Sequence, residues 1–436
     1  MNHSDSERID AFMQKNGFSK PKINDEEKLT PETLKNIDIF IINTCGIRQM
    51  AEDRVFGLIK NLRKNNPKIK IVITGCLADR KDIHKRMKDV NLFTAIKNFP
   101  KDVSGIIHNT KNLSKENIDY LSIRPKHNNS FQAYVPIMTG CNNFCSYCVV
   151  PYARGREISR PADEIIDEIK NLIKNDCKHI ILLGQNVNSY ASKVYKVSKV
   201  RKEKIEEINF SKLLKMIDKI PGKFWISFVS SHPKDVNDEM IETVARCKKV
   251  CENFHLPIQS GNNSILEKMN RKYSAKDYLK ITKKIKIAFK KHKPDLPFAI
   301  TSDIIVGFPG ETKKQLEDSA KVMREVKFDM VFFGQFSPRP GTAAWKMKDN
   351  VSKKEKESRM KYLNEILKKT TLANNKQYLG KKLNVLIEQQ KDDFYFGKTR
   401  SGKNVKITSN KKDLIGKIIK VRITRISTWN LEGISF

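Results

Sequence analysis

The sequence lacks any stretch of about 18 consecutive apolar residues, the length at which a hydrophobic helix can span a membrane. Its first residues, Met1 to Arg8, are polar and contain no apolar run of the kind found in signal peptides. Only eight cysteines occur among 436 residues. Without an export signal, such thiols are expected to bind metal or stay free in a reducing compartment. These absences predict a cytoplasmic protein with no membrane segment.

Acidic residues are scarce relative to basic ones, with 49 Asp and Glu against 84 Lys and Arg, a formal net charge of +35. Positive charge on this scale attracts polyanions and releases their counterions, which makes nucleic acid the leading class of partner. A composition rich in lysine, asparagine and isoleucine also arises in AT-rich genomes. The charge alone therefore does not decide whether the protein binds nucleic acid. Hydrophobic residues, at 39%, are sufficient for two or three globular domains.

The first third of the chain alternates helical and strand patterns. Strand–helix–strand order implies an α/β fold with a parallel sheet and crossover helices. Cys45 and Cys76 each follow one expected strand, at the sheet edge where open α/β folds bind their ligands. The elements expected from apolar periodicity are a helix over 4–15, a strand over 37–42, a helix over 51–64 and a strand over 69–73.

A polar segment over 122–130 resembles a linker, and strand and helix patterns then repeat as far as residue 352. This repetition fits a partial (β/α) barrel with its chemistry at the carboxyl ends of the strands. The basic stretch 193–204 is expected to be a solvated surface loop. The barrel strands are expected at 133–138, 179–183, 225–229, 254–257, 299–306 and 331–336.

A charged helix expected over 353–378 leads to a C-terminal region of different character. Short alternating strands separated by turn residues suggest a small β-barrel, and its basic strands are compatible with RNA binding. The strands are expected at 383–389, 394–397, 404–408 and 417–426.

Three cysteines stand in one short loop, where Cys141, Cys145 and Cys148 form a C-x3-C-x2-C spacing. Soft thiolates suit iron–sulfur clusters, and three of them can hold three irons of a 4Fe-4S cube and leave the fourth open for a small molecule. A zinc site would need a second pair or a nearby histidine, and the next cysteine, Cys177, is alone. The alternatives are a structural metal knuckle or three unrelated thiols.

The segment 138–157 around this loop closely resembles the methylthiotransferase family of radical S-adenosylmethionine (SAM) enzymes. Four further segments resemble the branch that acts on N6-isopentenyladenosine in tRNA, and the resemblance covers essentially the whole chain. It implies an N-terminal methylthiotransferase domain over 1–121, a radical SAM barrel over 127–365 and a TRAM β-barrel over 372–436. The four segments are 1–7, 183–190, 231–233 and 255–261, and Gly397 to Arg400 is the fragment typical of TRAM.

This resemblance implies two 4Fe-4S clusters and SAM as cofactors. The cluster on Cys141, Cys145 and Cys148 would convert SAM into a 5′-deoxyadenosyl radical, which removes hydrogen from C2 of isopentenyladenosine at position 37 of tRNA. An auxiliary cluster would present a methylated sulfur, with the methyl group coming from a second SAM. A radical suits an unactivated C–H bond, and a metal site suits a soft sulfur. The implied partners are tRNA and an electron donor such as flavodoxin or ferredoxin, and a monomer is expected.

The resemblance also implies roles for individual residues. Cys45 and Cys76 match two ligands of the auxiliary cluster, and the segment 303–312 matches a strand and loop beside SAM. Cys177, Cys247 and Cys251 match no ligand position and are expected to be buried and structural. Candidates for the SAM or substrate pocket are Tyr147, Gly184 and Gln259, and candidates for tRNA contact are Lys398 and Arg400.

The sequence departs from the family pattern at its start, where the family has Gly-Cys-Gln-Met-Asn after a strand and this sequence begins at Met-Asn. The first cysteine of the auxiliary cluster is therefore missing. One explanation is a start upstream of Met1, which intact-mass analysis of the native protein would test. The other is a chain with two auxiliary cysteines, which would form the radical and insert little sulfur.

Two other functions compete with this interpretation. One is a sibling methylthiotransferase that acts on threonylcarbamoyl-adenosine or on a ribosomal protein. The other is a tRNA-binding homologue deficient in sulfur insertion; in its fully non-catalytic form, it would keep only the barrel and the basic tail, and the complete set of Cys141, Cys145 and Cys148 argues against that form.

Overall fold

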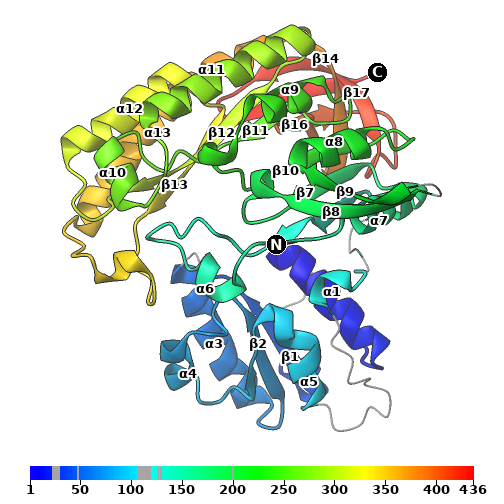
Figure 1. Cartoon of the computed structure of the whole chain (residues 1–436), viewed down its shortest axis with the longest axis vertical. Coiled ribbons are helices and arrows are strands. Elements are labelled where there is room, and N and C mark those ends of the chain that lie inside the picture. The colour runs from blue at the N-terminus through cyan, green and yellow to red at the C-terminus, as the bar shows by residue number, and fades with distance from the viewer. Residues whose placement is uncertain (22–29, 47–48, 107–118, 126, 128–129, 199–200) are drawn as a thin grey trace. The chain divides into compact units, whose positions relative to one another are not determined.

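A computed structural model describes the chain except residues 22–29, 47–48, 107–118, 126, 128–129 and 199–200 (Figure 1). It divides into two compact units. The cysteine loop belongs to the first unit, together with the N-terminal residues, although barrel strands flank it in the sequence. The first unit contains Met1–Asn128, Thr139–Ile158 and Ser337–Lys346, and the second contains Asn129–Met138, Ser159–Phe336 and Met347–Phe436.

The first unit is built on a parallel sheet of order β1-β2-β3, as expected. Thr44 pairs with Gly75 at the carboxyl ends of β1 and β2, so the next residues, Cys45 and Cys76, follow at the same sheet edge. The two-residue strand β3 is too short to give a sequence pattern. The strands are β1 (Ile39–Thr44), β2 (Lys70–Gly75) and β3 (Leu92–Phe93).

Helices cover both faces of this sheet (Figure 1). Alternation along β2 sends Val72 to one face and Ile71 and Ile73 to the other. Val72 packs with α1 (Asn2–Lys15) and α5 (Phe99–Ser104), whereas Ile71 and Ile73 pack with α3 (Gln49–Asn65) and α4 (Lys81–Arg86). The remaining helices here are α2 (Pro31–Lys35) and α6 (Val150–Arg154).

The second unit contains the expected partial barrel as two three-stranded parallel sheets, β4-β7-β10 and β11-β12-β13. A parallel bridge between Ile226 of β10 and Val250 joins the two sheets in sequence order. The strands are β4 (Gln132–Pro136), β7 (His179–Leu183), β10 (Trp225–Phe228), β11 (Asn253–His255), β12 (Ala299–Val306) and β13 (Met330–Gln335), and the short strands β5 (Met138–Thr139) and β6 (Ile158–Ser159) flank the cysteine loop.

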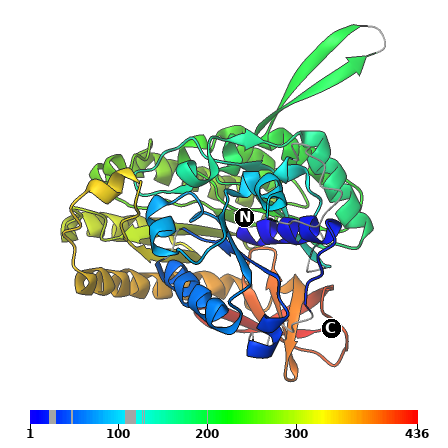
Figure 2. The ribbon, with the colours of Figure 1, turned by 90° about the horizontal axis from the view of Figure 1, so that it is seen from below.

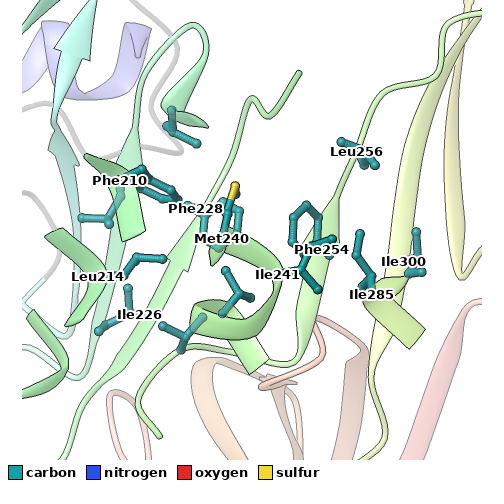
Figure 3. Close-up of a cluster of buried hydrophobic side chains, with 14 of the residues drawn as sticks. Phe210, Leu214, Ile226, Phe228, Met240, Ile241, Phe254, Leu256, Ile285 and Ile300 are labelled. Carbon is teal, nitrogen blue, oxygen red and sulfur yellow. The ribbon is translucent and has the colours of Figure 1, made fainter. Parts of the chain in front are cut away.

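The barrel core lies between these strands and their covering helices (Figure 3). Phe210 and Leu214 from α8 and Met240 from α9 pack against Ile226 and Phe228 of β10, and all five are buried. Apolar residues at helical spacing on α8 and α9 create this contact. The helices are α7 (Ala162–Lys174), α8 (Phe210–Asp218), α9 (Asp238–Arg246), α10 (Asn263–Lys268), α11 (Ala275–His292) and α12 (Lys313–Val326).

The basic stretch 193–204 is not the loop that we predicted. It belongs to an antiparallel hairpin of β8 (Ala191–Ser198) and β9 (Arg201–Asn209), which extends away from the barrel (Figure 2). Valine and isoleucine recur in both arms of the sequence, a strand signal that we ranked below the dense charge. Within this stretch, residues 199–200 lie outside the described part of the chain.

The C-terminal region is a closed barrel of order β14-β15-β16-β18-β17, reached through α13 (Lys353–Asn375). The sequence predicted four of its strands and missed β18, which closes the barrel by pairing with both β16 and β17. Alternating apolar residues such as Val385, Val405 and Leu431 fill the interior. The strands are β14 (Lys382–Lys391), β15 (Phe394–Thr399), β16 (Asn404–Thr408), β17 (Ile418–Ile426) and β18 (Asn430–Ser435).

Within the described residues, every helix is too short or too polar to cross a lipid bilayer.

Candidate functional site

Cys141, Cys145 and Cys148 stand in one short loop, and a tight turn joins the last two. Cys141 and Cys145 are buried, and Cys148 is half-buried. Gly140 has φ +78°, and a Cβ there would lie 1.9 Å from the carbonyl oxygen of Arg156. Only glycine permits this close approach. The Cys148 N–H donates to the Cys145 carbonyl at 2.9 Å, which closes the turn.

The same unit brings the strand-end cysteines to this loop. Cys45 and Cys76 follow β1 and β2, and the Cys76 N–H donates to the Thr44 carbonyl at 3.1 Å. A Cβ at Gly46 would lie 2.9 Å from the Cβ of Cys76 and 3.2 Å from Cγ2 of Val149. Val149 is the residue after Cys148. The five cysteines that we predicted as ligands therefore belong to one unit, where the two sets approach each other.

Burial and mutual repulsion disfavour free thiolates in this unit. Burial, together with the neighbouring charges of Cys145, Cys141 and Cys76, raises the pKa of Cys148 to about 12. Burial also raises the pKa of Cys141. A bound cationic metal reverses this preference because it stabilises the deprotonated ligand.

Thiolates, which are soft donors, are the ligand type that suits an iron–sulfur cluster. No three histidine, cysteine, aspartate or glutamate side chains in the described part of the chain are close enough to hold one metal ion. A 4Fe-4S cube takes one thiolate per iron, so its ligands stand farther apart than those of a single ion.

A buried ion pair fixes the helix that follows the cysteine loop. Nη2 of Arg154, on α6, donates to Asp5 of α1, and the Tyr120 hydroxyl donates to the same carboxylate. Nη1 of Arg154 is buried and has no hydrogen-bond partner in the described part of the chain. The negative charges of Asp5 and Cys76 raise the pKa of Arg154 against the effect of burial. Arg154 therefore places a buried positive charge near Cys76, a role that sequence reasoning missed.

A third segment of the first unit, Ser337–Lys346, also contacts the cysteine loop. The Ala344 N–H donates to the Ser146 carbonyl at 2.7 Å, and the Thr342 hydroxyl donates to the Arg339 carbonyl at 2.7 Å. Arg339 is buried; burial lowers its pKa, and the charges of Glu52 and Cys45 act in the opposite direction. The Arg-Pro-Gly-Thr sequence was the available signal for this segment, and our sequence analysis did not use it.

In the second unit, the loops after β7 and β10 carry buried polar atoms without partners. These atoms have no hydrogen-bond partner among the residues that the structure describes, and native proteins leave few buried polar groups in that condition. Loops at the carboxyl ends of barrel strands are where ligands bind. The atoms are Oε1 of Gln185, Oδ1 of Asn186 and Asn188, Oγ of Ser231 and Nε2 of His232.

His232 is a neutral hydrogen-bond donor within this group. Burial lowers its pKa to about 2, and the nearby positive charges of Arg271 and Lys234 lower it as well. Nδ1 of His232 accepts from the Lys234 N–H at 3.3 Å, so the single ring proton is on Nε2. Together with the amide oxygens of Asn186 and Asn188, this N–H suits a ligand that has both donors and acceptors, as SAM and a nucleoside do.

Gly184 and Gln259 lie at the same ends of the strands. A Cβ at Gly184 would lie 2.6 Å from Cγ of Met138, so tight packing requires glycine there. Gln259 has φ +69°, a left-handed conformation that is costly for a non-glycine residue and that occurs frequently at functional sites. Its N–H donates to the Asp303 carbonyl at 2.9 Å and its carbonyl accepts from the Ile305 N–H at 3.0 Å.

The inner face of the barrel strands is polar. Along β12, Ile300 and Ile304 pack under the helices, whereas Thr301 and Asp303 alternate with them and point to the other face. Nδ1 of His255 lies 2.9 Å from Oγ1 of Thr301, and Nε2 lies 3.6 Å from Oδ2 of Asp303.

Arg400, for which we predicted a tRNA contact, forms a buried ion pair in this structure. Its Nε and Nη2 donate to the two carboxylate oxygens of Glu252 at 2.7 and 2.8 Å, and Nη2 also donates to the carbonyls of Lys248 and Val250 at 2.8 Å each. These bonds attach the C-terminal barrel to the amino ends of β10 and β11. Lys398 is exposed, 3.2 Å from Glu388, and remains available to a polyanion.

The other predicted residues are placed as follows. Tyr147 is half-buried between Cys145 and Cys148. The three remaining cysteines are buried, as expected, and burial raises their pKa values, to about 11 for Cys177, about 11 for Cys247 and about 12 for Cys251.

Comparison with known proteins defines the class. Residues 135–323 match the Radical SAM superfamily, residues 1–95 match the Uncharacterized protein family UPF0004, and residues 376–435 match the TRAM domain. A radical SAM methyltransferase, TsrM from Kitasatospora setae, shares the fold with a TM-score of 0.53 at 14% identity over 79% of this chain and 72% of that one. The chain is thus a radical SAM enzyme with a C-terminal TRAM barrel, and a 4Fe-4S cluster and SAM are its cofactors.

Two curated relatives give the particular family. The tRNA-2-methylthio-N(6)-dimethylallyladenosine synthase of Clostridium novyi (strain NT) is 38% identical over 450 residues, covering 99% of this chain and 94% of the relative. The enzyme of that name from Thermoanaerobacter pseudethanolicus (strain ATCC 33223 / 39E) is 37% identical over 456 residues, covering 99% and 90%. This chain belongs to the tRNA-2-methylthio-N(6)-dimethylallyladenosine synthase family. The resemblance noted from its motifs is therefore confirmed.

Proposed function

We propose that this chain adds a methylthio group to C2 of N6-isopentenyladenosine at position 37 of tRNA, with SAM as the source of both the radical and the methyl group. The observation that carries the proposal is the approach of two cysteine sets within one unit. Cys141, Cys145 and Cys148 lie on a tight loop, and Cys45 and Cys76 lie at strand ends beside Val149. Radical formation and sulfur transfer need two such sets.

We assign the 4Fe-4S cluster that binds SAM to Cys141, Cys145 and Cys148, and an auxiliary cluster to Cys45 and Cys76. When bound, the first group supplies one electron to SAM and the second holds the sulfur that is transferred. The chain's own contribution is to bury the thiols, which keeps water away from reactive species.

The polar groups at the strand ends of the second unit have the character of a ligand site. We assign the unpartnered amide oxygens of Asn186 and Asn188 and the Nε2–H of His232 to binding SAM or the adenosine. Gly184 and Gln259 belong to the same assignment, because tight packing and a left-handed backbone hold the loops around these groups in place. Tyr147 is assigned to SAM by its position between two ligand cysteines.

The inner face of the barrel offers groups for the substrate base. Phe332 of β13 is 59% exposed and its ring lies 6.2 Å from that of His255. An exposed aromatic ring can stack on a base, and His255 and Asp303 can form hydrogen bonds with its edge. We assign this face to the adenosine.

The proposal includes the remaining predictions that lack a direct test. These are the domain limits 1–121, 127–365 and 372–436, a tRNA contact by Lys398, an electron donor such as flavodoxin or ferredoxin, a monomeric state and a cytoplasmic location. The net charge of +35 supports tRNA as the partner.

Mass spectrometry of tRNA nucleosides from a deletion strain tests the function. We expect the methylthio derivative of isopentenyladenosine to disappear, its precursor to accumulate, and the wild-type gene to restore it. Loss of the methylthio derivative of threonylcarbamoyl-adenosine instead would show the sibling function. A deletion strain with unchanged nucleosides would refute the proposal.

Cysteine variants separate the two sets in the purified enzyme. Cys148→Ala should abolish 5′-deoxyadenosine formation from SAM, whereas Cys76→Ala should preserve it and abolish methylthiolation. Each of these two variants should contain about four irons fewer than the wild type, because each loses one 4Fe-4S cluster. Cys177→Ala, which changes a buried cysteine outside both sets, is the matched control and should retain activity. Full methylthiolation by Cys76→Ala would contradict the assignment of the auxiliary site.

A further inference from the structure

The cysteine loop carries a surface that the chemistry assigned above does not use. Tyr152, on α6, is 56% exposed, and Arg156 is also exposed. The Tyr152 ring meets the ring of Phe144 edge to face, with centroids 6.0 Å apart, and Cζ of Arg156 lies 4.5 Å from the Phe144 centroid. We name these three residues the aromatic–arginine platform. Phe144 contacts both of the others, unlike the single exposed apolar residues that are normal on protein surfaces.

The backbone of the loop holds the platform in place. Phe144 has φ +47°, a left-handed conformation that is unfavourable for an aromatic residue. Two reciprocal hydrogen bonds join the ends of the loop: the Asn142 N–H donates to the Glu157 carboxylate at 3.2 Å, and the Glu157 N–H donates to Oδ1 of Asn142 at 3.3 Å. The close approach of Gly140 to the Arg156 carbonyl adds a third constraint. A strained backbone held by its surroundings is typical of functional segments.

The chemistry of the platform favours unpaired nucleic-acid bases as its occupant. Aromatic rings and guanidinium planes stack on bases in single-stranded RNA, and arginine also attracts the phosphates. The net charge of +35 draws RNA to this chain as a whole. A membrane or a protein partner would need a wider apolar surface than two rings and an arginine provide.

We propose that Phe144, Tyr152 and Arg156 form a stacking platform for an unpaired base of the tRNA. This inference rests on the proposed function. Phe144 lies between Cys141 and Cys145, so a base stacked there is held beside the proposed cluster. Taking a base out of its stack in the tRNA costs free energy, and stacking of that base on the platform offsets the cost.

Variants outside the proposed ligand set test the platform in the full-length, cluster-loaded enzyme. Tyr152→Ala and Arg156→Gln should each weaken binding of an isopentenylated anticodon stem-loop by about tenfold, the size expected for one stacked base. Tyr152→Trp, unlike Tyr152→Ala, should bind with the affinity of the wild type, because it keeps an aromatic face. The matched controls are Tyr362→Ala and Arg246→Gln. Both residues belong to the second unit, where Tyr362 is 40% exposed and Arg246 is also exposed. These controls should leave binding unchanged.

A fluorescent base distinguishes stacking from a general loss of affinity. With 2-aminopurine next to the target adenosine, binding to the wild-type enzyme should change the fluorescence by stacking. The bound complex of Tyr152→Ala, at saturating protein, should lack that change. Iron content and SAM cleavage without RNA should match the wild type in all variants. The proposal would be overturned if both platform variants bound the stem-loop with an affinity within twofold of the wild type and showed the same fluorescence change.

This experiment separates the platform from the proposed function. If the wild-type enzyme methylthiolates the stem-loop and the platform variants bind it equally well, only the platform is refuted. If the wild-type enzyme neither binds nor modifies the stem-loop, the proposed function itself fails and the platform fails with it.

Discussion

Arg400→Met should destabilise the second unit without removing a tRNA contact. Glu252 is 2% exposed at its side chain, and Arg400 supplies two of its hydrogen bonds, at 2.7 and 2.8 Å. Arg400 and Lys293 together keep the pKa of Glu252 low although burial raises it. Methionine preserves much of the apolar length of the arginine and removes its charge, so the change isolates the ion pair.

The structure sets the expected size of this effect. Removing one partner of a buried ion pair costs about 3–5 kcal/mol, because the other charge stays buried without compensation. Lys293 still lies 2.9 Å from Oε1 of Glu252 and compensates part of its charge. The cost should therefore lie at the lower end of that range. We expect a loss of about 3 kcal/mol in the free energy of unfolding. The double variant with Glu252→Gln should lose less than the sum of the single variants.

Urea unfolding followed by circular dichroism measures this loss, and Lys398→Met is the control. Lys398 is 48% exposed and forms a surface pair with Glu388, so its removal should cost less than about 1 kcal/mol. Below the unfolding range, Arg400→Met should bind tRNA like the wild type, whereas Lys398→Met should bind it more weakly and with a smaller salt dependence. An unfolding free energy within 1 kcal/mol of the wild type, or a normal fold with weak tRNA binding, would refute the docking role of Arg400.

Three further changes test other contacts. Asp5→Asn should destabilise the first unit by about 3 kcal/mol in urea unfolding, because Arg154 stays buried without its carboxylate; an unchanged midpoint would contradict this. Burial lowers the pKa of His232 to about 2, so only the unfolded chain takes up this proton and the free energy of unfolding should fall below about pH 6.5, by about 1.4 kcal/mol per pH unit. His232→Asn should remove the contribution of this residue, whereas His179, whose pKa burial lowers to about 3, should keep its own. Gly261→Ala would place a Cβ 2.5 Å from a backbone oxygen and should lower the melting temperature, whereas Gly334→Ala, with no atom within 4 Å, should not.

Much of the fold could be predicted because the spacing of apolar residues indicates which side of a helix or strand is buried. The strand expected at 299–306 is β12 with the same limits, and 179–183 is β7. The failures have physical causes. The strand β18 depends on pairing with β16 and β17 from two directions, which no local pattern records. The hairpin of β8 and β9 was hidden by its charge, although its β-branched residues carried the signal.

The site shows the same division. Motif spacing made Cys141, Cys145 and Cys148 the predicted ligands of one cluster, and the family resemblance, together with strand-end position, made Cys45 and Cys76 predicted ligands of the other. Neither could show that Arg400 is turned toward Glu252, because a basic residue has the same sequence signal whether it meets RNA or a buried carboxylate.

By itself, the sequence determined which cysteines are candidate ligands and in which order most of the strands and helices follow. Thiolate spacing and alternating burial are local properties, so the chain records them directly. Tertiary structure alone decided which groups meet: the two cysteine sets in one unit, Arg154 beside Cys76, and the unpartnered polar atoms after β7 and β10. Such contacts join residues far apart in the chain, and their energies depend on burial, which exists only once the chain has folded.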